Sequence, residues 1–344
     1  MIRLAISGAG AITERAHIPA FLSVPEIQIV ALQSRTIEKC ERVVAATMAG
    51  AQLHIYRDYD EMLRREHPDA VGIFTPNALH CEFTLKAIAA GAHVLVEKPM
   101  ATTVAAARRM LEVSKQAKRV LMVAMQRRFG GFERAIRRAL ENGAIGTPHF
   151  IRSRLSHGGP ALWAPGQNWF FERSDAGGGA MLDLGVHVAD LARWFMGEVE
   201  SVSGQISTLG KSIGVEDNGA ALLKFRSGAL GIVEASWTSR PALSGTEIYG
   251  SEGRIMAGYP RLDIAVLKHD GSEVAGFERD EIMKTFNPRD RIAPSRELAR
   301  TFAAAIAGSA TASPSGEDGL RAIEIVEACY RSALEGSAIK LPLG

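Results

Sequence analysis

The segment that decides the fold is residues 2–13, which read Ile2-Arg3-Leu4-Ala5-Ile6-Ser7-Gly8-Ala9-Gly10-Ala11-Ile12-Thr13. An apolar, β-rich run ends at a glycine turn, and the chain then continues directly into a stretch with helical periodicity. This order is the context in which a dinucleotide pyrophosphate binds, with the helix N-terminus facing the phosphates. An ordinary strand-to-helix turn has the same pattern, because a lone glycine fingerprint is a weak signal.

The glycine turn contains the first candidate cofactor-binding residues. Gly8 permits the tight turn, and Gly10 lets the backbone come close to a pyrophosphate. Ile12 and Thr13 follow at the start of the helix, and Thr13 stands where such a fingerprint has its third glycine. Because position, strand and helix agree, we predict a nucleotide site here.

Short β-rich runs alternate with helical stretches over residues 1–125. We expect strands at residues 2–6, 27–32, 70–74, 93–96 and 120–123, and helices at residues 12–22, 38–48, 79–90 and 104–117. Repeated strand–helix–strand units form a parallel sheet that binds ligands at the carboxyl ends of its strands. Residues 1–128 are therefore predicted to be an α/β domain, a doubly wound Rossmann dinucleotide-binding domain.

The pattern changes after Phe129. Residues 150–277 are mostly strand-like segments broken by Gly and Ser, and helices are expected at residues 182–196, 295–307 and 320–334. We predict that residues 129–344 form an α+β substrate-binding and oligomerisation domain with a large, mostly antiparallel open sheet. The expected helices do not fully cover such a sheet, which favours a homodimer or homotetramer formed through it.

Composition limits the class of protein. A length of 344 residues suggests about two domains, and 47% hydrophobic with 23% charged residues is ordinary globular usage. The formal net charge of +2 is too balanced to make nucleic acid or an acidic membrane the expected partner. No run reaches the roughly 18 apolar residues of a membrane span, and we recognise no signal-peptide pattern.

The cysteines bear on compartment and metal binding. Cys40, Cys81 and Cys329 are far apart and odd in number, which fits neither a disulfide framework nor a zinc spacing. This usage indicates a reducing environment. We therefore expect a cytoplasmic protein without a bound metal.

The end of the second expected strand bears on the choice of cofactor. Folds that bind NAD place an acidic residue there to bind the ribose hydroxyls, but Val30-Ala31-Leu32-Gln33-Ser34-Arg35-Thr36 contains no acid. Ser34 offers a hydroxyl and Arg35 a planar guanidinium, which together suit a 2′-phosphate. The segment favours NADP, although Arg35 could also be a solvated loop charge.

A lysine follows the expected strand at residues 93–96. In Glu97-Lys98-Pro99, the proline restricts the backbone of Lys98 and so limits the direction of its side chain. Lys98 is expected at the carboxyl edge of the sheet, where ligands bind. An ammonium group beside a nicotinamide can stabilise negative charge that develops on a reacting oxygen. Taken alone, a lysine at a strand end is more often simply solvated.

The second domain contains a glycine-rich loop, Gly177-Gly178-Gly179, that leads into a helix. Asp183, His187 and Asp190 follow at positions i, i+4 and i+7 and are expected to share one helix face. A carboxylate one turn from an imidazole can orient the ring and hold its tautomer, as a general base requires. A capping Asp with a buried core His would give the same spacing, and this face supplies too few ligands for zinc.

Taken together, these segments resemble the Gfo/Idh/MocA family of glucose-fructose oxidoreductase and inositol 2-dehydrogenase. The resemblance spans nearly the whole chain. Besides Gly8 and Gly10, it rests on Thr75-Pro76-Asn77 with His80, Glu97-Lys98-Pro99, Gln126-Arg127-Arg128-Phe129, the triple glycine with Asp183, Gly185, His187 and Asp190, and Tyr249-Gly250-Ser251-Glu252-Gly253.

Membership of this family implies a nicotinamide-dependent oxidoreductase acting on a sugar, polyol or related carbohydrate. It implies catalytic positions at Lys98, Asp183 and His187. It also implies that further matching residues bind the cofactor, namely Thr75, Pro76, Asn77, His80, Glu97, Lys98 and Gln126. The missing acid near Ser34 departs from the NAD-binding pattern, so the expected cofactor is NAD(P), with a leaning toward NADP.

The mechanism we expect is hydride transfer between nicotinamide C4 and a carbinol carbon. His187 would exchange the hydroxyl proton, Lys98 would stabilise the alkoxide-like oxygen, and Asp183 would orient His187 and a substrate hydroxyl. All three would also contact the substrate.

Three residues before the glycine-rich loop could line the sugar site: Trp163, Asn168 and Trp169. For the tryptophans, packing in the core is an equally reasonable role. Two other functions stay open: an NAD-dependent glycosidase that works by transient oxidation and elimination, and a non-catalytic nicotinamide or sugar sensor on the same scaffold.

Overall fold

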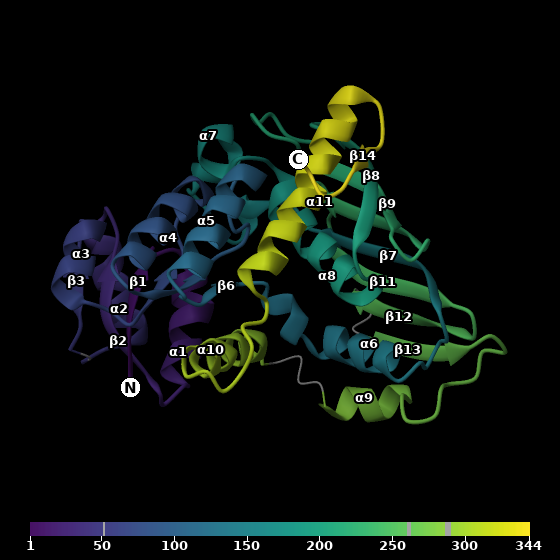
Figure 1. The fold of residues 1–344 in the computed structure, drawn as a ribbon, viewed down its shortest axis with the longest axis horizontal. Helices are drawn as coiled ribbons and strands as arrows, with labels where there is room; N and C mark the ends of the chain where they lie inside the picture. The colour runs from purple at the N-terminus through teal and green to yellow at the C-terminus, as the bar shows by residue number, and fades with distance from the viewer. Residues whose placement is uncertain (51, 260–262, 286–289) are drawn as a thin grey trace. The chain divides into compact units, whose positions relative to one another are not determined.

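The computed structural model describes residues 1–50, 52–259, 263–285 and 290–344. The chain forms two compact units, coloured along the chain in Figure 1. Residues 1–129 and 291–320 form one, here called the Rossmann unit, and residues 130–290 and 321–344 form the other, here called the sheet unit. Residues 291–320 thus group with the first unit, whereas the single expected boundary after residue 128 assigned them to the second.

The Rossmann unit contains a six-stranded parallel sheet in the order β3-β2-β1-β4-β5-β6. This is the doubly wound order in which the direction of winding reverses between β1 and β4, so the predicted fold class is confirmed. The strands are β1 (Ile2–Ser7), β2 (Ile27–Gln33), β3 (His54–Tyr56), β4 (Ala70–Ile73), β5 (His93–Val96) and β6 (Leu121–Val123).

Helices follow the strands of this unit. They are η1 (Thr13–His17), α1 (Ile18–Leu22), α2 (Ile37–Thr47), α3 (Tyr59–Glu66), η2 (Asn77–Leu79), α4 (His80–Ala89), α5 (Val104–Gln116), η3 (Gln126–Phe129) and α10 (Ala293–Ile306). Thr103 caps α5 as expected, because its side chain accepts the amide of Ala106. The helix expected at residues 12–22 instead begins as a wider π-turn, η1.

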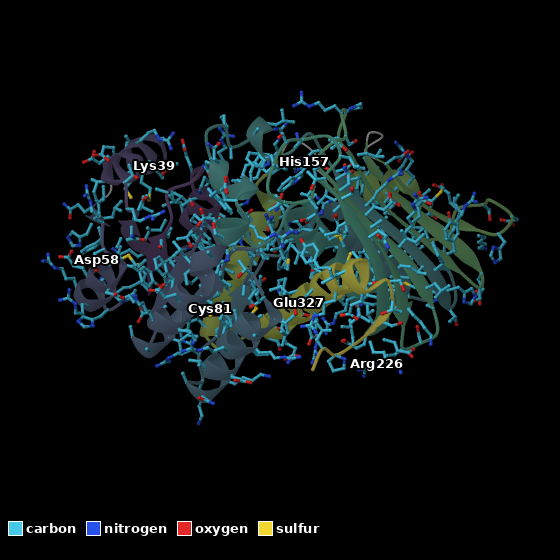
Figure 2. All side chains as sticks on the ribbon, turned by 90° about the horizontal axis from the view of Figure 1, so that it is seen from above. Lys39, Asp58, Cys81, His157, Arg226 and Glu327 are labelled. Atoms are coloured by element: carbon cyan, nitrogen blue, oxygen red, sulfur yellow. The ribbon has the colours of Figure 1, made fainter. Side chains whose placement is uncertain are left out.

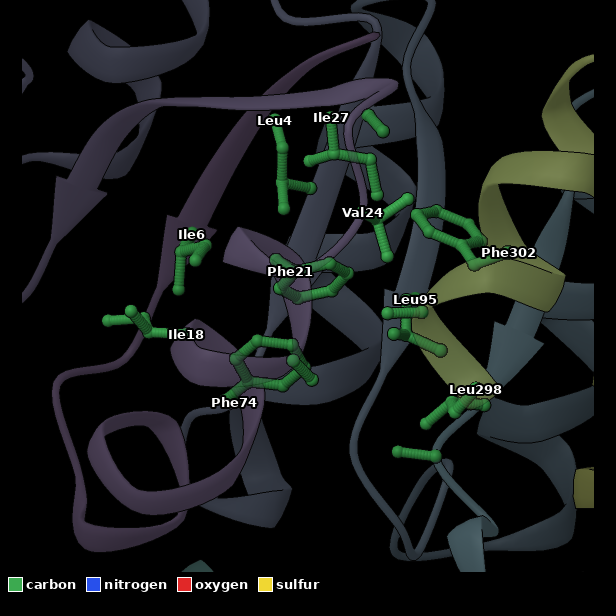
Figure 3. Close-up of a cluster of buried hydrophobic side chains, with 14 of the residues drawn as sticks. Leu4, Ile6, Ile18, Phe21, Val24, Ile27, Phe74, Leu95, Leu298 and Phe302 are labelled. Carbon is green, nitrogen blue, oxygen red and sulfur yellow. The ribbon is translucent and has the colours of Figure 1, made fainter. Parts of the chain in front are cut away.

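The grouping of α10 with the first unit has a packing cause. Leu298 and Phe302 of this helix are fully buried in one hydrophobic cluster with Phe21 of α1 and the strand residues Leu4 and Leu95 (Figure 3). Burial of apolar surface is the main stabilising contribution to a core. The helix therefore covers the same face of the parallel sheet as α1, although it lies far away in sequence.

The sheet unit is built on eight strands in the order β13-β12-β11-β7-β10-β9-β8-β14. All neighbours are antiparallel except β7 and β10, which agrees with the predicted large, mostly antiparallel sheet. The strands are β7 (Pro148–Ser156), β8 (Val199–Ser207), β9 (Asn218–Phe225), β10 (Leu230–Ser236), β11 (Leu243–Gly250), β12 (Gly253–Tyr259), β13 (Asp263–Lys268) and β14 (Ile339–Lys340).

Two helices of this unit, α6 and α8, pack against one face of the eight-stranded sheet (Figure 1). The helical segments of the unit are α6 (Gly131–Glu141), η4 (Pro160–Leu162), η5 (Asn168–Phe171), α7 (Arg173–Ala176), η6 (Met181–Gly185), α8 (Val186–Met196), α9 (Arg279–Thr285) and most of α11 (Gly316–Glu335). The start of α11, up to Leu320, belongs to the Rossmann unit. Strand residues alternate accordingly: Val233 and Ala235 of β10 are buried, whereas Leu230 and Ile232 point to the other face.

Charged side chains cover the outside of the Rossmann unit, as Lys39 and Asp58 show in Figure 2. In the parts of the chain that the structure describes, no helix is both long and apolar enough to cross a membrane. The described residues likewise bring together no group of three or more His, Cys, Asp or Glu side chains that could hold a metal ion.

Candidate active site

The predicted cofactor-binding residues lie at one edge of the parallel sheet. Because all six strands are parallel, their carboxyl ends meet at that edge. The residues that follow them are Gly8 and Gly10 after β1, Ser34 and Arg35 after β2, Thr75, Pro76 and Asn77 after β4, Glu97 and Lys98 after β5, and Gln126 after β6. Ile12 and Thr13 lie between the glycine turn and the rest of η1.

Gly8 directly follows β1 and lies against the backbone of Phe74, which directly follows β4. Its φ of 105° is a conformation that residues with a side chain rarely adopt. A Cβ here would overlap the backbone carbonyl oxygen of Phe74, which follows β4. The tight turn expected at Gly8 is therefore present, and no other residue type fits there.

The end of β2 presents no carboxylate. Gln33 is buried, accepts a hydrogen bond from the Ser7 hydroxyl at 2.6 Å and donates to the Arg57 carbonyl at 2.8 Å. Beyond it, the Ser34 hydroxyl accepts the amide of Thr36, and Arg35 is exposed. The first side chains that a ribose could meet here are thus a hydroxyl and a guanidinium.

Two buried oxygens fit a bound polar ligand. Within the described chain, neither the Thr13 hydroxyl nor the Gln126 amide oxygen has a hydrogen-bond partner. Buried polar groups are normally paired, so each exception calls for an unseen partner such as water or a ligand. Both residues lie at predicted cofactor positions. A hydroxyl that can donate or accept and an amide oxygen that accepts suit the hydroxyls and amide of a nicotinamide dinucleotide.

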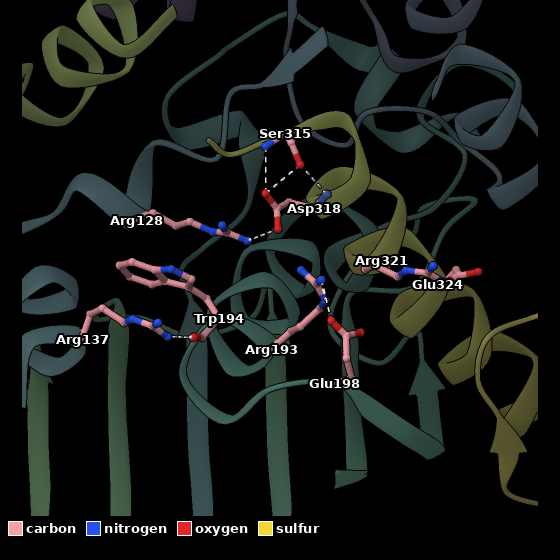
Figure 4. Close-up of polar contacts among 9 residues, drawn as sticks. All are labelled: Arg128, Arg137, Arg193, Trp194, Glu198, Ser315, Asp318, Arg321 and Glu324. Atoms are coloured by element: carbon pink, nitrogen blue, oxygen red, sulfur yellow. Dashed lines mark hydrogen bonds and ion pairs between the residues drawn. The ribbon is translucent and has the colours of Figure 1, made fainter. Parts of the chain in front are cut away.

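Gln126 begins the short helix η3, and an ion pair two residues further along holds this helix in place. The buried guanidinium of Arg128 lies 3.1 Å from Asp318 Oδ1, and Asp318 Oδ2 accepts hydrogen bonds from the amide and hydroxyl of Ser315 (Figure 4). All of these residues belong to the Rossmann unit. An ion pair with such fixed partners holds the backbone of η3 in place.

Glu97 and His80, two of the predicted cofactor-binding residues, make hydrogen bonds within the protein. Both are buried, and their polar atoms are used inside the protein. Glu97 Oε1 lies 2.6 Å from His17 Nε2, and the His80 ring nitrogens lie 2.8 Å from the Pro99 oxygen and 2.9 Å from the Thr75 oxygen. These contacts fix the two side chains, and their contact with the cofactor stays a prediction.

In the sheet unit, the glycine-rich loop is held by one buried carboxylate, that of Glu216. Its Oε1 accepts the amides of Gly179 at 2.9 Å and Met181 at 3.0 Å, and the hydroxyl of Tyr330 at 2.7 Å. A Cβ on Gly179 would overlap the Glu216 carbonyl oxygen, so glycine is required for this approach. Burial raises the pKa of Tyr330 well above its usual value, and the negative charge of Glu216 adds to this effect.

The helix expected at residues 182–196 begins as a π-turn. Asp183 lies in η6, whereas His187 and Asp190 lie in α8, and all three are buried. Asp183 Oδ2 accepts a hydrogen bond from the indole N–H of Trp237 at 3.1 Å. The wider turn changes the angle between Asp183 and His187 from that of a regular helix, and such turns are frequent at functional sites.

The predicted sugar-site aromatics pack on a buried neighbour, Phe170. Trp169 stacks on it at 3.8 Å between ring centroids, and Trp163 meets it edge-on at 5.2 Å. Both indoles stay half-buried, and Asn168 between them in sequence is exposed. Packing is therefore one role of these tryptophans, and contact with substrate stays a prediction.

Sequence reasoning did not find Trp237, Glu216 or His17. The partners of Glu216 are 37 and 114 residues away in the chain, and those of Trp237 and His17 are 54 and 80 residues away. Motif spacing reports neighbours along a helix or loop, and it carries no signal for pairs at such separations.

The chain is similar in sequence to known oxidoreductases. A sequence model described as "Oxidoreductase family, NAD-binding Rossmann fold" matches residues 2–125, and one described as "GFO/IDH/MocA C-terminal domain" matches residues 134–256. The 1,5-anhydro-D-fructose reductase of Ensifer adhaerens is 32% identical over 290 residues, which is 83% of each chain. The chain belongs to the Gfo/Idh/MocA family.

Further relatives agree with this assignment. Myo-inositol 2-dehydrogenase of Thermotoga maritima is 32% identical over 296 residues, 83% of this chain and 84% of its own. The WlbA dehydrogenase of Bordetella pertussis, solved with NADH and UDP-GlcNAcA, has a TM-score of 0.88 at 26% identity and covers 100% of this chain and 98% of its own. The predicted class, a nicotinamide-dependent oxidoreductase, is confirmed.

The Glu216 anchor leads to a stability prediction. Replacing Tyr330 with Phe removes one donor from a buried carboxylate and should lower the free energy of unfolding by about 1–3 kcal/mol in urea denaturation. Ser272→Ala is the control, because the Ser272 hydroxyl donates to Asp270 at 2.6 Å on the exposed surface. It should change stability by less than about 0.5 kcal/mol, and equal losses in both variants would contradict the anchor.

Proposed function

We propose that this protein transfers a hydride between NAD(P) and a carbinol or keto carbon of a sugar or polyol. The observation that carries the proposal is a glycine turn at the switch point of a doubly wound sheet, with Lys98 at the same sheet edge. The sugar and polyol oxidoreductases among its relatives support the substrate class.

The bound nicotinamide would supply or accept the hydride. His187 would take the hydroxyl proton during oxidation and return it during reduction, because a positioned imidazole can do both near neutral pH. Lys98 would stabilise the negative charge that develops on the reacting oxygen. Asp183, held by the Trp237 indole, would orient His187 and a substrate hydroxyl.

Assays of a panel of candidate substrates test this proposal. Polyols, aldoses, ketosugars, sugar phosphates and nucleotide sugars are assayed in both directions by following reduced-nicotinamide absorbance. We expect turnover with a neutral cyclic carbohydrate or its keto form, because we find no phosphate-binding motif outside the cofactor domain. Products of glycoside cleavage without net change in nicotinamide would instead identify the glycosidase alternative.

On the best substrate of that panel, His187→Asn should lower turnover by ~10²–10⁴ and leave cofactor binding nearly intact. Lys98→Ala should also cripple turnover, and the two losses should be strongly non-additive because both groups would act on one oxygen. Oxidation by the wild type should rise with pH as one group loses a proton, since only a neutral base accepts one, and His187→Asn should lose this limb. Unchanged turnover and pH dependence in this variant would remove His187 from the mechanism.

For the cofactor, we propose a preference for NADP. Its support is the exposed guanidinium of Arg35 beside Ser34, with no acidic residue at residues 30–36. Arg35→Ala should weaken NADPH by about 10- to 100-fold in a fluorescence titration and leave NADH nearly unchanged, because the 2′-phosphate loses a charge-assisted bond. Arg64→Ala removes an exposed cation from α3 and serves as the control. Tighter binding of NADH than NADPH by the wild type would contradict this preference.

We also propose that the protein is a cytoplasmic homodimer or homotetramer that assembles through the open face of the eight-stranded sheet. Leu222, Leu230 and Tyr249 are exposed on this face, and Phe150 lies between the latter two in register. An exposed apolar patch of this kind favours association. Sedimentation should give a dimer or tetramer, which Leu230→Glu dissociates, and a wild-type monomer at micromolar concentration would contradict the assembly.

A further inference from the structure

The backbone of the proposed catalytic lysine is bound by a buried carboxylate. Glu97 directly follows β5 and is 6% exposed. Its Oε2 accepts the amide of Lys98 at 2.9 Å, and its Oε1 lies 2.6 Å from His17 Nε2. A carboxylate accepts hydrogen bonds and does not donate, so the His17 nitrogen that faces it carries a proton.

His17 is itself held by packing. It ends the π-turn η1 that follows the glycine turn, and it is 1% exposed. Its ring is nearly parallel to that of Phe74, with an interplanar angle of 6° and a centroid separation of 3.8 Å. Phe74 follows β4 and is buried. The imidazole is therefore fixed against one face of an aromatic ring with Nε2 toward Glu97.

The charges in this cluster favour an ionised Glu97. Burial alone would raise the pKa of the Glu97 carboxyl group, but the hydrogen bond and charge of His17 and the charge and amide of Lys98 outweigh burial and lower it. An ionised carboxylate binds an amide more strongly than a neutral acid does. Loss of the His17 donor would remove the largest of the contributions that keep Glu97 ionised.

A second histidine holds the same segment from its other side. The fully buried ring of His80 lies 2.8 Å from the Pro99 carbonyl oxygen and 2.9 Å from that of Thr75. Burial lowers the pKa of His80, against the effect of its two backbone hydrogen bonds. The Lys98 amide is thus bound by Glu97, which in turn contacts His17 of η1, and the Pro99 carbonyl oxygen is contacted by His80 of α4.

We propose that His17 is a positioning residue for Lys98, acting through the Glu97 carboxylate. The inference rests on the proposed function, in which the Lys98 ammonium group must meet the reacting oxygen. Misplacing a reacting group by about 1 Å can cost a hundredfold in rate. His17 donates a hydrogen bond to the Glu97 carboxylate, and the Lys98 amide donates a second one to the same group. Together these two bonds set the position from which the Lys98 side chain extends.

The decisive variant is His17→Phe, which keeps a ring against Phe74 and removes the proton donor. We expect it to lower turnover on the best panel substrate by about 10- to 100-fold and to leave the NADPH dissociation constant within about threefold. Combined with Lys98→Ala, it should cause no further loss of turnover, because the group that it positions is already gone.

His54→Phe is the matched control. His54 Nδ1 also lies 2.6 Å from a buried carboxylate, that of Glu66, but at β3, which is separated from β5 by three strands. Removing this second histidine–carboxylate contact should leave turnover within about twofold. Glu97→Gln repeats the test with a side chain of the same shape, in case His17→Phe does not fold, and it should also lower turnover at least tenfold.

The position of the Lys98 backbone can also be tested without a substrate. Amide hydrogen exchange in the cofactor-free protein should speed up at Lys98 in His17→Phe and stay unchanged there in His54→Phe. Wild-type turnover in both His17→Phe and Glu97→Gln, or the same fractional loss in the Lys98→Ala background, would overturn the positioning role. If Lys98→Ala alone keeps wild-type turnover, the proposed function fails instead, and exchange at Lys98 still reports whether His17 anchors its backbone.

Discussion

The close approach of Gly8 to the backbone of Phe74 is the constraint on which the Rossmann unit depends. It brings β1 and β4 together at the point where the sheet reverses its winding, and only a residue without a Cβ permits it. Phe74, whose backbone Gly8 approaches, also stacks its ring on His17 at the end of η1. Gly8 is thus connected to Lys98 through a series of contacts: Phe74 stacks on His17, and His17 contacts the carboxylate that binds the Lys98 amide.

The sheet unit solves its positioning problem with hydrogen bonds. The glycine-rich loop before its proposed catalytic residues has little side-chain packing of its own and a large conformational entropy to lose on folding. Glu216 compensates by accepting two loop amides and the Tyr330 hydroxyl with one oxygen. The loop can then lead into the π-turn that carries Asp183 in a single conformation.

Local patterns predicted much of this molecule, and they failed where distant contacts decide. The strand at residues 93–96 was predicted to its ends because an apolar run between turn residues needs no tertiary information. The short strand β3 and helix α3 were missed, although Asp58 followed by Glu61 is a capping pattern, and the Asp58 side chain accepts the Glu61 amide. The unit to which α10 belongs could not be predicted, because an apolar helix face can pack on the core of either unit. Only the structure shows that Phe302 is buried in the same cluster as Phe21.

Two of the proposed catalytic residues, Lys98 and Asp183, share one structural feature: a buried carboxylate accepts backbone amides at the residue itself or shortly before it. Glu97 accepts the amide of Lys98, and Glu216 accepts amides on both sides of Ala180, shortly before Asp183. A carboxylate suits this task because it only accepts hydrogen bonds, and its desolvation is tolerable when several donors converge on it. Each backbone amide that the carboxylate binds is held in position. A reacting side chain can therefore be fixed by a carboxylate that binds the chain one residue or one turn away. The motifs of a family name the reacting residues, whereas the partners of these carboxylates are found only in three dimensions.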